Sequence, residues 1–202
     1  MMAERDPRPA QIAVLGTLLA YGAWWLDFEV TWSRAAVAIG MALTTQLVGS
    51  RLAGQRFDPR SPVISGLSLA LLLRTDALWL LAVGAVLAIG SKFVLRWQGR
   101  HVWNPTCLAI VVLLLATDRV WVSAGQWGSG PLLAFAVASL GVTVLTRCPR
   151  RDVTFAFLVC YAGLVVGRAW WLGDPLVIPL HALQSGALLI FAFFMISDPK
   201  TV

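Results

Sequence analysis

The stretch S-P-V-I-S-G-L-S-L-A-L-L-L-R-T-D, from Ser61 to Asp76, has a counterpart near the end of the chain, P-L-H-A-L-Q-S-G-A-L-L-I-F-A-F-F-M-I-S-D-P, from Pro179 to Pro199. Both open near a proline, place Ser-Gly before a run of large apolar residues and reach an aspartate at their end. The first holds only about twelve apolar residues, whereas a full membrane span needs roughly twenty. Short or interrupted hydrophobic segments at matching places of two halves are typical of membrane proteins built from repeats, and they indicate a binding site. Chance recurrence of Ser-Gly among the 17 glycines is the alternative.

The composition is that of an integral membrane protein. Of the 202 residues, 58% are hydrophobic and 13% are charged, and the mean hydropathy is +0.77. Soluble domains carry roughly 25% charged residues. We expect one transmembrane domain over residues 1–202 in a lipid bilayer. The net charge of +6 comes from arginines in short loops beside apolar runs, which indicates membrane topology rather than nucleic-acid binding.

The hydropathy pattern predicts an all-α, polytopic fold with about eight membrane-embedded helical segments. Their expected ranges are 11–27, 33–50, 62–73, 77–95, 105–117, 131–146, 153–169 and 176–196. Asn104-Pro105 is a helix start, because Asn caps free N–H groups and Pro fits the first helical position. Lys92 falls about one turn inside the end of the fourth segment, where a lysine side chain can extend to the membrane surface.

Charge placement predicts the orientation of these segments. With the N-terminus in the cytoplasm, only four of the 16 lysines and arginines lie outside, namely Arg34, Arg74, Arg119 and Arg168. This bias follows the positive-inside rule and predicts a multi-pass protein of the cell inner (cytoplasmic) membrane with both termini cytoplasmic. All ten tryptophans then fall near segment ends, as expected for interfacial anchors.

In this orientation the third segment runs outward and the eighth runs inward. The Ser-Gly pair therefore predicts an incomplete five-plus-five inverted repeat, with a first repeat at about 11–117 and a partial second repeat at about 131–202. We expect residues 62–73 and 180–196 to meet near the bilayer midplane, where Gly66 and Gly186 let two backbones approach closely.

Two stretches carry a family resemblance. G-S-K-F-V-L-R-W-Q-G-R-H-V-W-N-P (90–105) and S-G-A-L-L-I-F-A-F-F-M-I-S-D-P (185–199) resemble the motif regions of the NqrB/RnfD family, with the 121–128 run and the D-P-K-T ending closest to its UnbU-like branch. The family consists of membrane subunits of ion-pumping electron-transport complexes. The resemblance implies a ten-helix, two-repeat fold and electron transfer between flavins or quinones coupled to ion movement, with other membrane subunits as partners.

The chain departs from the family in two places. The family attaches FMN covalently to the last threonine of a Ser/Thr-Gly-Ala-Thr motif, whereas the matching loop here reads Ser129-Gly130-Pro131-Leu132 and has no threonine from 118 to 131. We therefore expect no covalent FMN, and a non-covalent flavin or quinone as the cofactor. The ninth and tenth helices are also missing from these 202 residues.

Polar groups inside the predicted spans are the candidate site, because such groups need internal partners in a bilayer. The candidate cofactor-binding residues are Ser65, Gly66, Lys92, Asn104, Gln184, Ser185, Gly186 and Asp198. Helix packing through small residues is the alternative for the Ser-Gly positions, and a solvated terminal carboxylate is the alternative for Asp198. No catalytic grouping or metal-ligand spacing is visible, so an accessory role in an oxidoreductase complex is the most that we expect of an enzyme. Two other classes stay open: a small-solute or ion transporter, and a structural subunit of a larger membrane complex.

Overall fold

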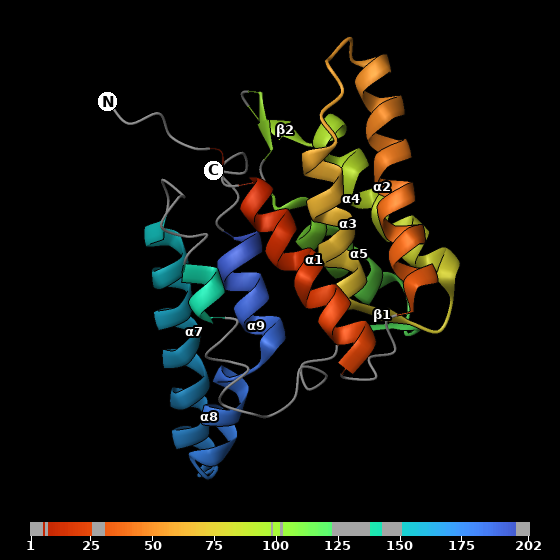
Figure 1. The fold of residues 1–202 in the computed structure, drawn as a ribbon. Coiled ribbons are helices and arrows are strands. Elements are labelled where there is room, and N and C mark those ends of the chain that lie inside the picture. The colour runs from red at the N-terminus through yellow and green to blue at the C-terminus, as the bar shows by residue number, and fades with distance from the viewer. Residues whose placement is uncertain are drawn as a thin grey trace. The chain divides into compact units, whose positions relative to one another are not determined.

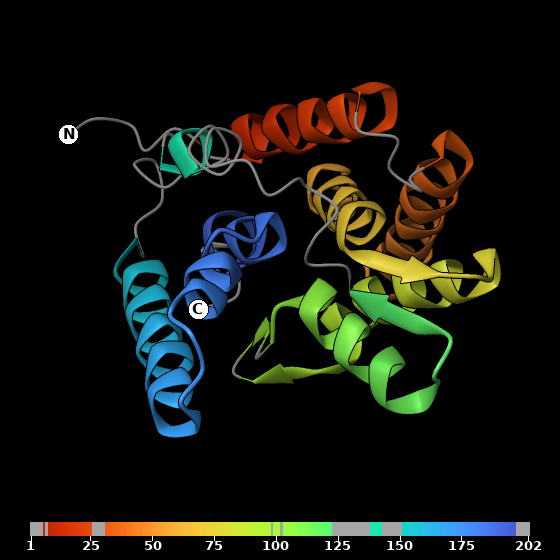
Figure 2. The ribbon, with the colours of Figure 1, turned by 90° about the horizontal axis from the view of Figure 1, so that it is seen from below.

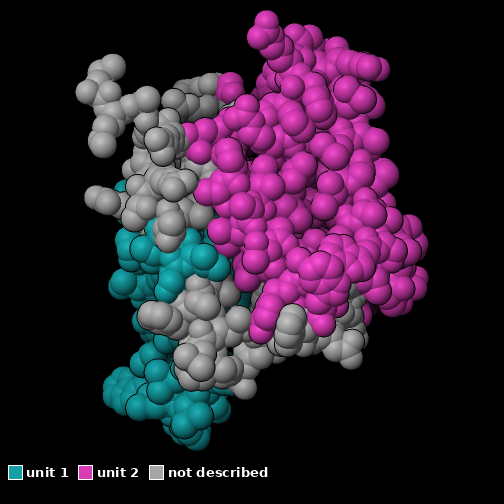
Figure 3. All heavy atoms as spheres, in the orientation of Figure 1, with its two compact units in different colours: residues 1–5, 124–199 teal, residues 6–123, 200–202 magenta. Residues whose placement is uncertain are grey.

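The computed structural model describes residues 6, 8–25, 31–97, 99–101, 103–122, 138–142 and 151–196. The chain is mostly helical (Figure 1), as the sequence predicts. It divides into two compact units, which Figure 3 colours separately. One comprises residues 6–123 with 200–202, and the other comprises residues 1–5 with 124–199.

The larger unit is built on five helices. They are α1 (Arg8–Trp25), α2 (Trp32–Leu52), α3 (Arg60–Leu72), α4 (Leu78–Val94) and α5 (Pro105–Ala116). The short helix α3 is the central one, because α1, α2, α4 and α5 all pack against it. All residues from Ser65 to Thr75 are buried. Apart from Arg60 and its serines, α3 is apolar on all sides, as is expected of a helix at the centre of a bundle.

Two glycines allow the helices of this unit to pack closely. A Cβ on Gly66 would lie 2.8 Å from the Ile39 Cα, so α3 rests directly on the backbone of α2. A Cβ on Gly49 would overlap the Phe93 ring at 2.4 Å. This second contact places the last turn of α2 against the last turn of α4. The ends of both helices, the start of α3 and the start of α5 therefore form one end of the bundle.

Two short strand pairs interrupt the all-helical pattern that the sequence predicts. At one end of the bundle, β1 (Leu73–Thr75) pairs antiparallel with β4 (Val120–Val122), and the two strands cross that end in Figure 2. At the other end, β2 (Arg96–Trp97) and β3 (Arg100–His101) form a hairpin that turns at Gly99, where φ is +80°. Where the chain leaves a helix, its backbone N–H and C=O groups lose their helical hydrogen-bond partners. Strand pairing supplies new partners, and such groups need them in an apolar environment.

The described part of the smaller unit is a helical hairpin. The helix α7 (Arg151–Leu172) turns at Gly173, where φ is +72°, into α8 (Val177–Leu183). Next come α9 (Gly186–Ile190) and a π-helical turn, η1 (Phe191–Met195). The predicted eighth segment is thus broken, and its two parts are bent by 43°. Residues 138–142 are also helical, but most of the predicted sixth segment lies outside the described residues.

The expectation of about eight membrane-embedded helical segments is not supported. Within the described residues, two helices are long and apolar enough to cross a membrane, α2 (Trp32–Leu52) and Asp152–Leu172 of α7, and the bent pair Val177–Leu183 with Gly186–Met195 makes up to three. The other apolar helices, α3, α4 and α5, have 12 to 17 residues. At 1.5 Å per residue they reach about 18 to 26 Å, less than a hydrocarbon core of roughly 30 Å.

Candidate functional site around Lys92

Lys92 lies buried between two helices. Its side chain comes from the last turn of α4 and is 5% exposed. Its Nζ donates a hydrogen bond of 2.6 Å to the Ser61 Oγ and a longer one of 3.5 Å to the Ser65 Oγ. Ser61 and Ser65 are four residues apart and so share one face of α3. The lysine side chain therefore turns toward α3. It does not extend to the membrane surface, which the sequence had left open as an alternative.

The position of this ammonium group is electrostatically unusual. Ser61 is in the first turn of α3 and Ser65 in the second. The N-terminal end of a helix carries a partial positive charge, which favours anions and disfavours cations. A buried lysine at that end adds to the positive potential. The cluster of Ser61, Ser65 and Lys92 thus suits a ligand atom that is anionic or carbonyl in character.

The neighbouring candidates on α3 are buried, but packing accounts for part of them. Ser65 and Ser68 are 5% and 1% exposed. The bare Cα of Gly66 faces the Ile39 backbone of α2. Its lack of a side chain serves the α2–α3 contact inside the larger unit. The Ser65 Oγ also accepts a hydrogen bond from Lys92.

Asn104 acts as the helix cap that the sequence predicts. Its Oδ1 accepts hydrogen bonds from the backbone N–H groups of Thr106 at 3.0 Å and Cys107 at 3.1 Å, and Pro105 occupies the first position of α5. The side-chain oxygen of Asn104 is therefore used in folding. The capping role does not depend on a ligand.

The remaining candidates belong to the smaller unit. Gln184 is exposed, Gly186 is buried, and Ser185 has extended backbone angles at the N-cap of α9. Asp198 and the loop 123–137 with its missing threonine lie outside the described residues. Because the two Ser-Gly segments fall in different units, their meeting at the bilayer midplane stays a prediction.

Arg74 is a buried cation that the sequence reasoning missed. It is 1% exposed, and its Nη1 donates to the carbonyl oxygens of Ala70 at 3.0 Å and Leu73 at 3.4 Å. The Arg34 Nη2 donates to the Thr75 carbonyl oxygen at 2.6 Å. Both arginines were counted as outer-loop charges, yet the structure uses them to hold β1. The apolar run that precedes Arg74 was the available signal, because it leaves the side chain little water to reach.

A surface ion network stands beside the start of α3. The Arg8 Nη1 lies 2.7 Å from an Asp58 carboxylate oxygen, and the Arg60 Nη1 lies 2.6 Å from an Asp6 carboxylate oxygen. The hydrogen bond from the Arg8 guanidinium lowers the pKa of Asp6 to about 2. Burial works to raise the pKa of Asp58, but the Arg60 backbone N–H and the Arg8 guanidinium outweigh it and lower that pKa. The two carboxylates and two guanidinium groups thus balance each other at neutral pH.

No group of three or more His, Cys, Asp or Glu side chains that could hold a metal ion is found within the described ranges. The two histidines are on β3 and α8. Comparison with models of known protein families gives no match, and comparison with curated proteins gives none either.

Proposed function

We propose that this chain is a membrane subunit of an electron-transport complex, and that Lys92 with Ser61 and Ser65 holds an oxygen atom of a non-covalently bound flavin or quinone. The single observation that carries the proposal is the buried ammonium group beside two hydroxyl groups at the N-terminal end of α3. An ionisable residue inside a membrane protein is by default a candidate functional residue, because its burial is costly.

The donor set fits this class of cofactor. Flavins and quinones carry carbonyl oxygens that accept hydrogen bonds and gain negative charge on reduction. An ammonium group and two serine hydroxyls offer donors to such an oxygen, and the N-terminal end of α3 adds favourable potential. The bound group would supply the redox chemistry, and the protein would supply binding and electrostatics. The resemblance of 90–105 to the NqrB/RnfD motif region, which includes Lys92, supports the same assignment.

The first test is the absorbance spectrum and quinone content of the purified, detergent-solubilised protein. We expect a flavin band or an extractable quinone at close to one per chain. In-gel fluorescence of the denatured 21.9 kDa chain should be absent, because no covalent flavin is expected. A protein with neither cofactor after mild purification would overturn the proposal.

The second test compares matched variants. Lys92→Met and Ser65→Ala should lower the bound cofactor about tenfold or more, since a charge-assisted hydrogen bond contributes roughly 1.5 kcal/mol or more. Ser91→Ala is the control, because the Ser91 Oγ bonds only within its own helix, to the Ala88 carbonyl oxygen at 2.8 Å. Equal cofactor content in all three variants would argue against the Lys92 site.

The proposal includes a location in the cell inner membrane with both termini cytoplasmic. The Lys/Arg asymmetry supports this orientation. A cysteine introduced at position 55 or 150 should then react with a membrane-impermeant reagent only after the cells are opened. Labelling at either position in intact cells would contradict the orientation.

Small-solute or ion transport is the second candidate function. The break between α8 and α9, with its 43° bend, favours it, because discontinuous helices form substrate sites in many transporters. Flux into proteoliposomes that is abolished by Gln184→Ala and Ser185→Ala but unaffected by Lys92→Met would favour transport over electron transfer.

A further inference from the structure

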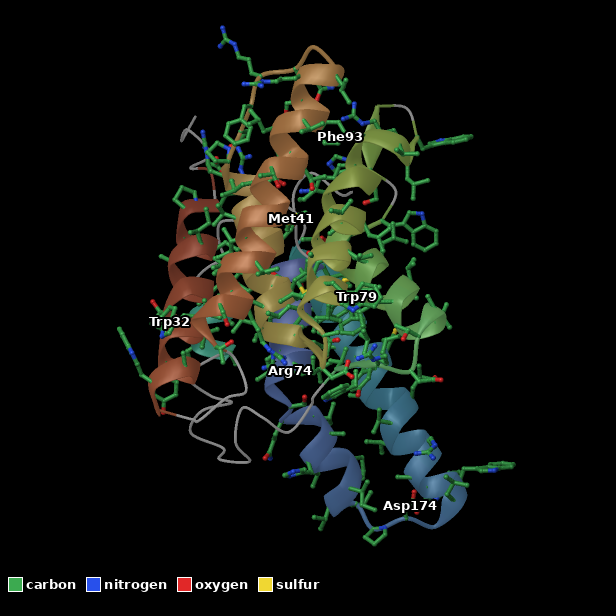
Figure 4. The ribbon with its side chains drawn as sticks, turned by 90° about the vertical axis from the view of Figure 1, so that its right-hand side faces the viewer. Trp32, Met41, Arg74, Trp79, Phe93 and Asp174 are labelled. Atoms are coloured by element: carbon green, nitrogen blue, oxygen red, sulfur yellow. The ribbon has the colours of Figure 1, made fainter. Side chains whose placement is uncertain are left out.

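The end of the larger unit at which α3 begins carries a concentration of exposed arginines. Arg51, Arg56 and Arg96 are all exposed. Arg51 is in the last turn of α2, and Arg96 begins β2, two residues after the end of α4. The packing of Gly49 against Phe93 places these helix ends side by side, and Figure 4 shows Phe93 at this end of the bundle with Arg74 toward the other.

Acidic side chains nearby do not cancel these charges. Asp6 and Asp58 are already paired with Arg8 and Arg60. The lowered pKa values of both aspartates keep that network ionised and balanced at neutral pH. Among the described ion pairs, none involves Arg51, Arg56 or Arg96. The Arg96 Nε donates to the Lys92 carbonyl oxygen, and the Arg96 guanidinium lies 5.6 Å from the centroid of the Phe93 ring. The side chains of Arg51, Arg56 and Arg96 nevertheless stay exposed, and none of the described carboxylates neutralises their charge.

Exposed aromatic and aliphatic side chains accompany the arginines. Trp97 and Trp103 are 71% and 60% exposed, and Leu52 and Val94 are 84% and 79% exposed. Tryptophan prefers the headgroup level of a bilayer, where its ring is apolar and its N–H is hydrated. Leu52 ends α2, one of the two helices long enough to span a membrane. The surface therefore lies where a membrane span would leave the bilayer.

We propose that the surface formed by Arg51, Arg56, Arg96, Trp97 and Trp103, here called the basic end, binds the headgroups of anionic phospholipids. The guanidinium groups pair with phosphate oxygens, because a guanidinium is planar and its several N–H donors match the geometry of a phosphate. The indole rings anchor beside the glycerol region. Charge complementarity calls for an anionic partner, and the exposed tryptophans and the adjoining span favour lipid over an acidic protein.

The opposite end of the same unit provides the contrast. There Arg34 donates to the Thr75 carbonyl oxygen, Arg74 is buried, and Arg119 pairs with Asp76 at 2.8 Å. Internal contacts thus engage the arginines of that end. The two ends differ in exposed charge: Arg34 is half-buried, Arg74 is buried and Arg119 is ion-paired, whereas Arg51, Arg56 and Arg96 are exposed and take part in none of the described ion pairs.

The experiment titrates phosphatidylglycerol or phosphatidylcholine into the full chain in neutral detergent and follows the midpoint of thermal unfolding. We expect phosphatidylglycerol alone to raise the midpoint, and we expect salt to weaken the effect. The double variant Arg51→Gln/Arg56→Gln should bind phosphatidylglycerol roughly 30-fold more weakly, since each arginine near an anionic surface contributes about a factor of five.

Two further double variants provide the controls. Arg119→Gln/Arg168→Gln removes the same charge from elsewhere and should bind the lipid as the unaltered chain does. Arg51→Lys/Arg56→Lys keeps the charge and should retain most of the binding. An equal loss in both Gln variants, or no loss in either, would overturn the proposal. So would lipid binding that survives in Arg51→Gln/Arg56→Gln while a copurifying acidic protein is lost, because the basic end would then be a protein interface.

Discussion

The two ends of α3 each hold a buried cation, and the cations differ in their surroundings. At the C-terminal end, Arg74 donates to the carbonyl oxygens of Ala70 and Leu73. At the N-terminal end, Lys92 donates to the hydroxyl groups of Ser61 and Ser65. Carbonyls at a helix C-terminus carry partial negative charge and favour a cation, whereas the N-terminus disfavours one by a comparable amount.

This difference separates a structural charge from a candidate functional one. If α3 continued, the backbone N–H of residue 74 would donate to the Ala70 carbonyl oxygen. Arg74 is instead part of β1, where its backbone is in register with Trp121. Its guanidinium supplies the missing donor, so Arg74 completes the end of α3. The Lys92 side chain instead donates to the hydroxyl groups of Ser61 and Ser65, near the N-terminal end of α3. It places positive charge where the helix is already positive, which costs stability.

The largest effect is expected from Arg74→Met. The substitution leaves the Ala70 and Leu73 carbonyl oxygens without their donor and creates space in a fully buried position. We expect the free energy of unfolding to fall by about 3 kcal/mol or more. The measurement is thermal or denaturant unfolding in detergent, with the exposed Arg119→Gln as the control. Equal stability of the two variants would remove the structural role of Arg74.

A smaller effect is expected from Gly66→Ala. The added Cβ would lie 2.8 Å from the Ile39 Cα, so α2 and α3 must separate, and we expect a loss of about 1 to 3 kcal/mol. Gly40→Ala is the matched control on α2, because no atom lies within 4 Å of its added Cβ. That control should be neutral or stabilising by up to about 1 kcal/mol. If the free energy of unfolding changes equally in Gly66→Ala and Gly40→Ala, the close contact between α2 and α3 does not fix the position of either end of α3.

Acid should weaken the network beside the Lys92 end by a still smaller amount. The folded pKa of Asp6 is about 2, below its ordinary value of 3.8. A lowered folded pKa gives stability that is present above the ordinary pKa and lost as the pH falls through the folded pKa. We expect a loss of about 0.5 to 1 kcal/mol between about pH 4 and pH 2, after allowance for solvent screening. Unfolding of Asp6→Asn, measured across the same range, should lack this component.

The smallest effect on stability is expected from Lys92→Met. Replacing a buried charge by an apolar side chain of similar volume is often neutral or stabilising. We expect unfolding of Lys92→Met to be no easier than that of the unaltered chain, although its cofactor content falls. A loss as large as that of Arg74→Met would show that both ends of α3 are structural, and it would break the contrast between them.

Local signals in the sequence were sufficient for several features. Asn104 and Pro105 mark the start of α5, since capping depends on neighbours along the chain. The polar and small residues in the first third of the eighth segment indicate an interrupted helix, although the sequence does not give the position of the break. Within the described residues, the apolar runs predict helices to within a few residues. They showed that the third segment is too short to cross a bilayer, but they did not show this for α4 and α5, because half-length helices and spans share the same composition.

Contacts between distant parts of the chain decided the candidate site. The spacing of Ser61 and Ser65 puts their hydroxyls on one face of α3, but it cannot reveal that this face meets α4 and Lys92. The same holds for Gly66, whose close neighbour is Ile39, and for Arg74, whose burial follows from the pairing of β1 with β4. Helix periodicity and capping are short-range consequences of backbone geometry. The choice between a lysine that extends to the membrane surface and one that turns inward depends on which helix packs beside it, and only the tertiary structure supplies that neighbour.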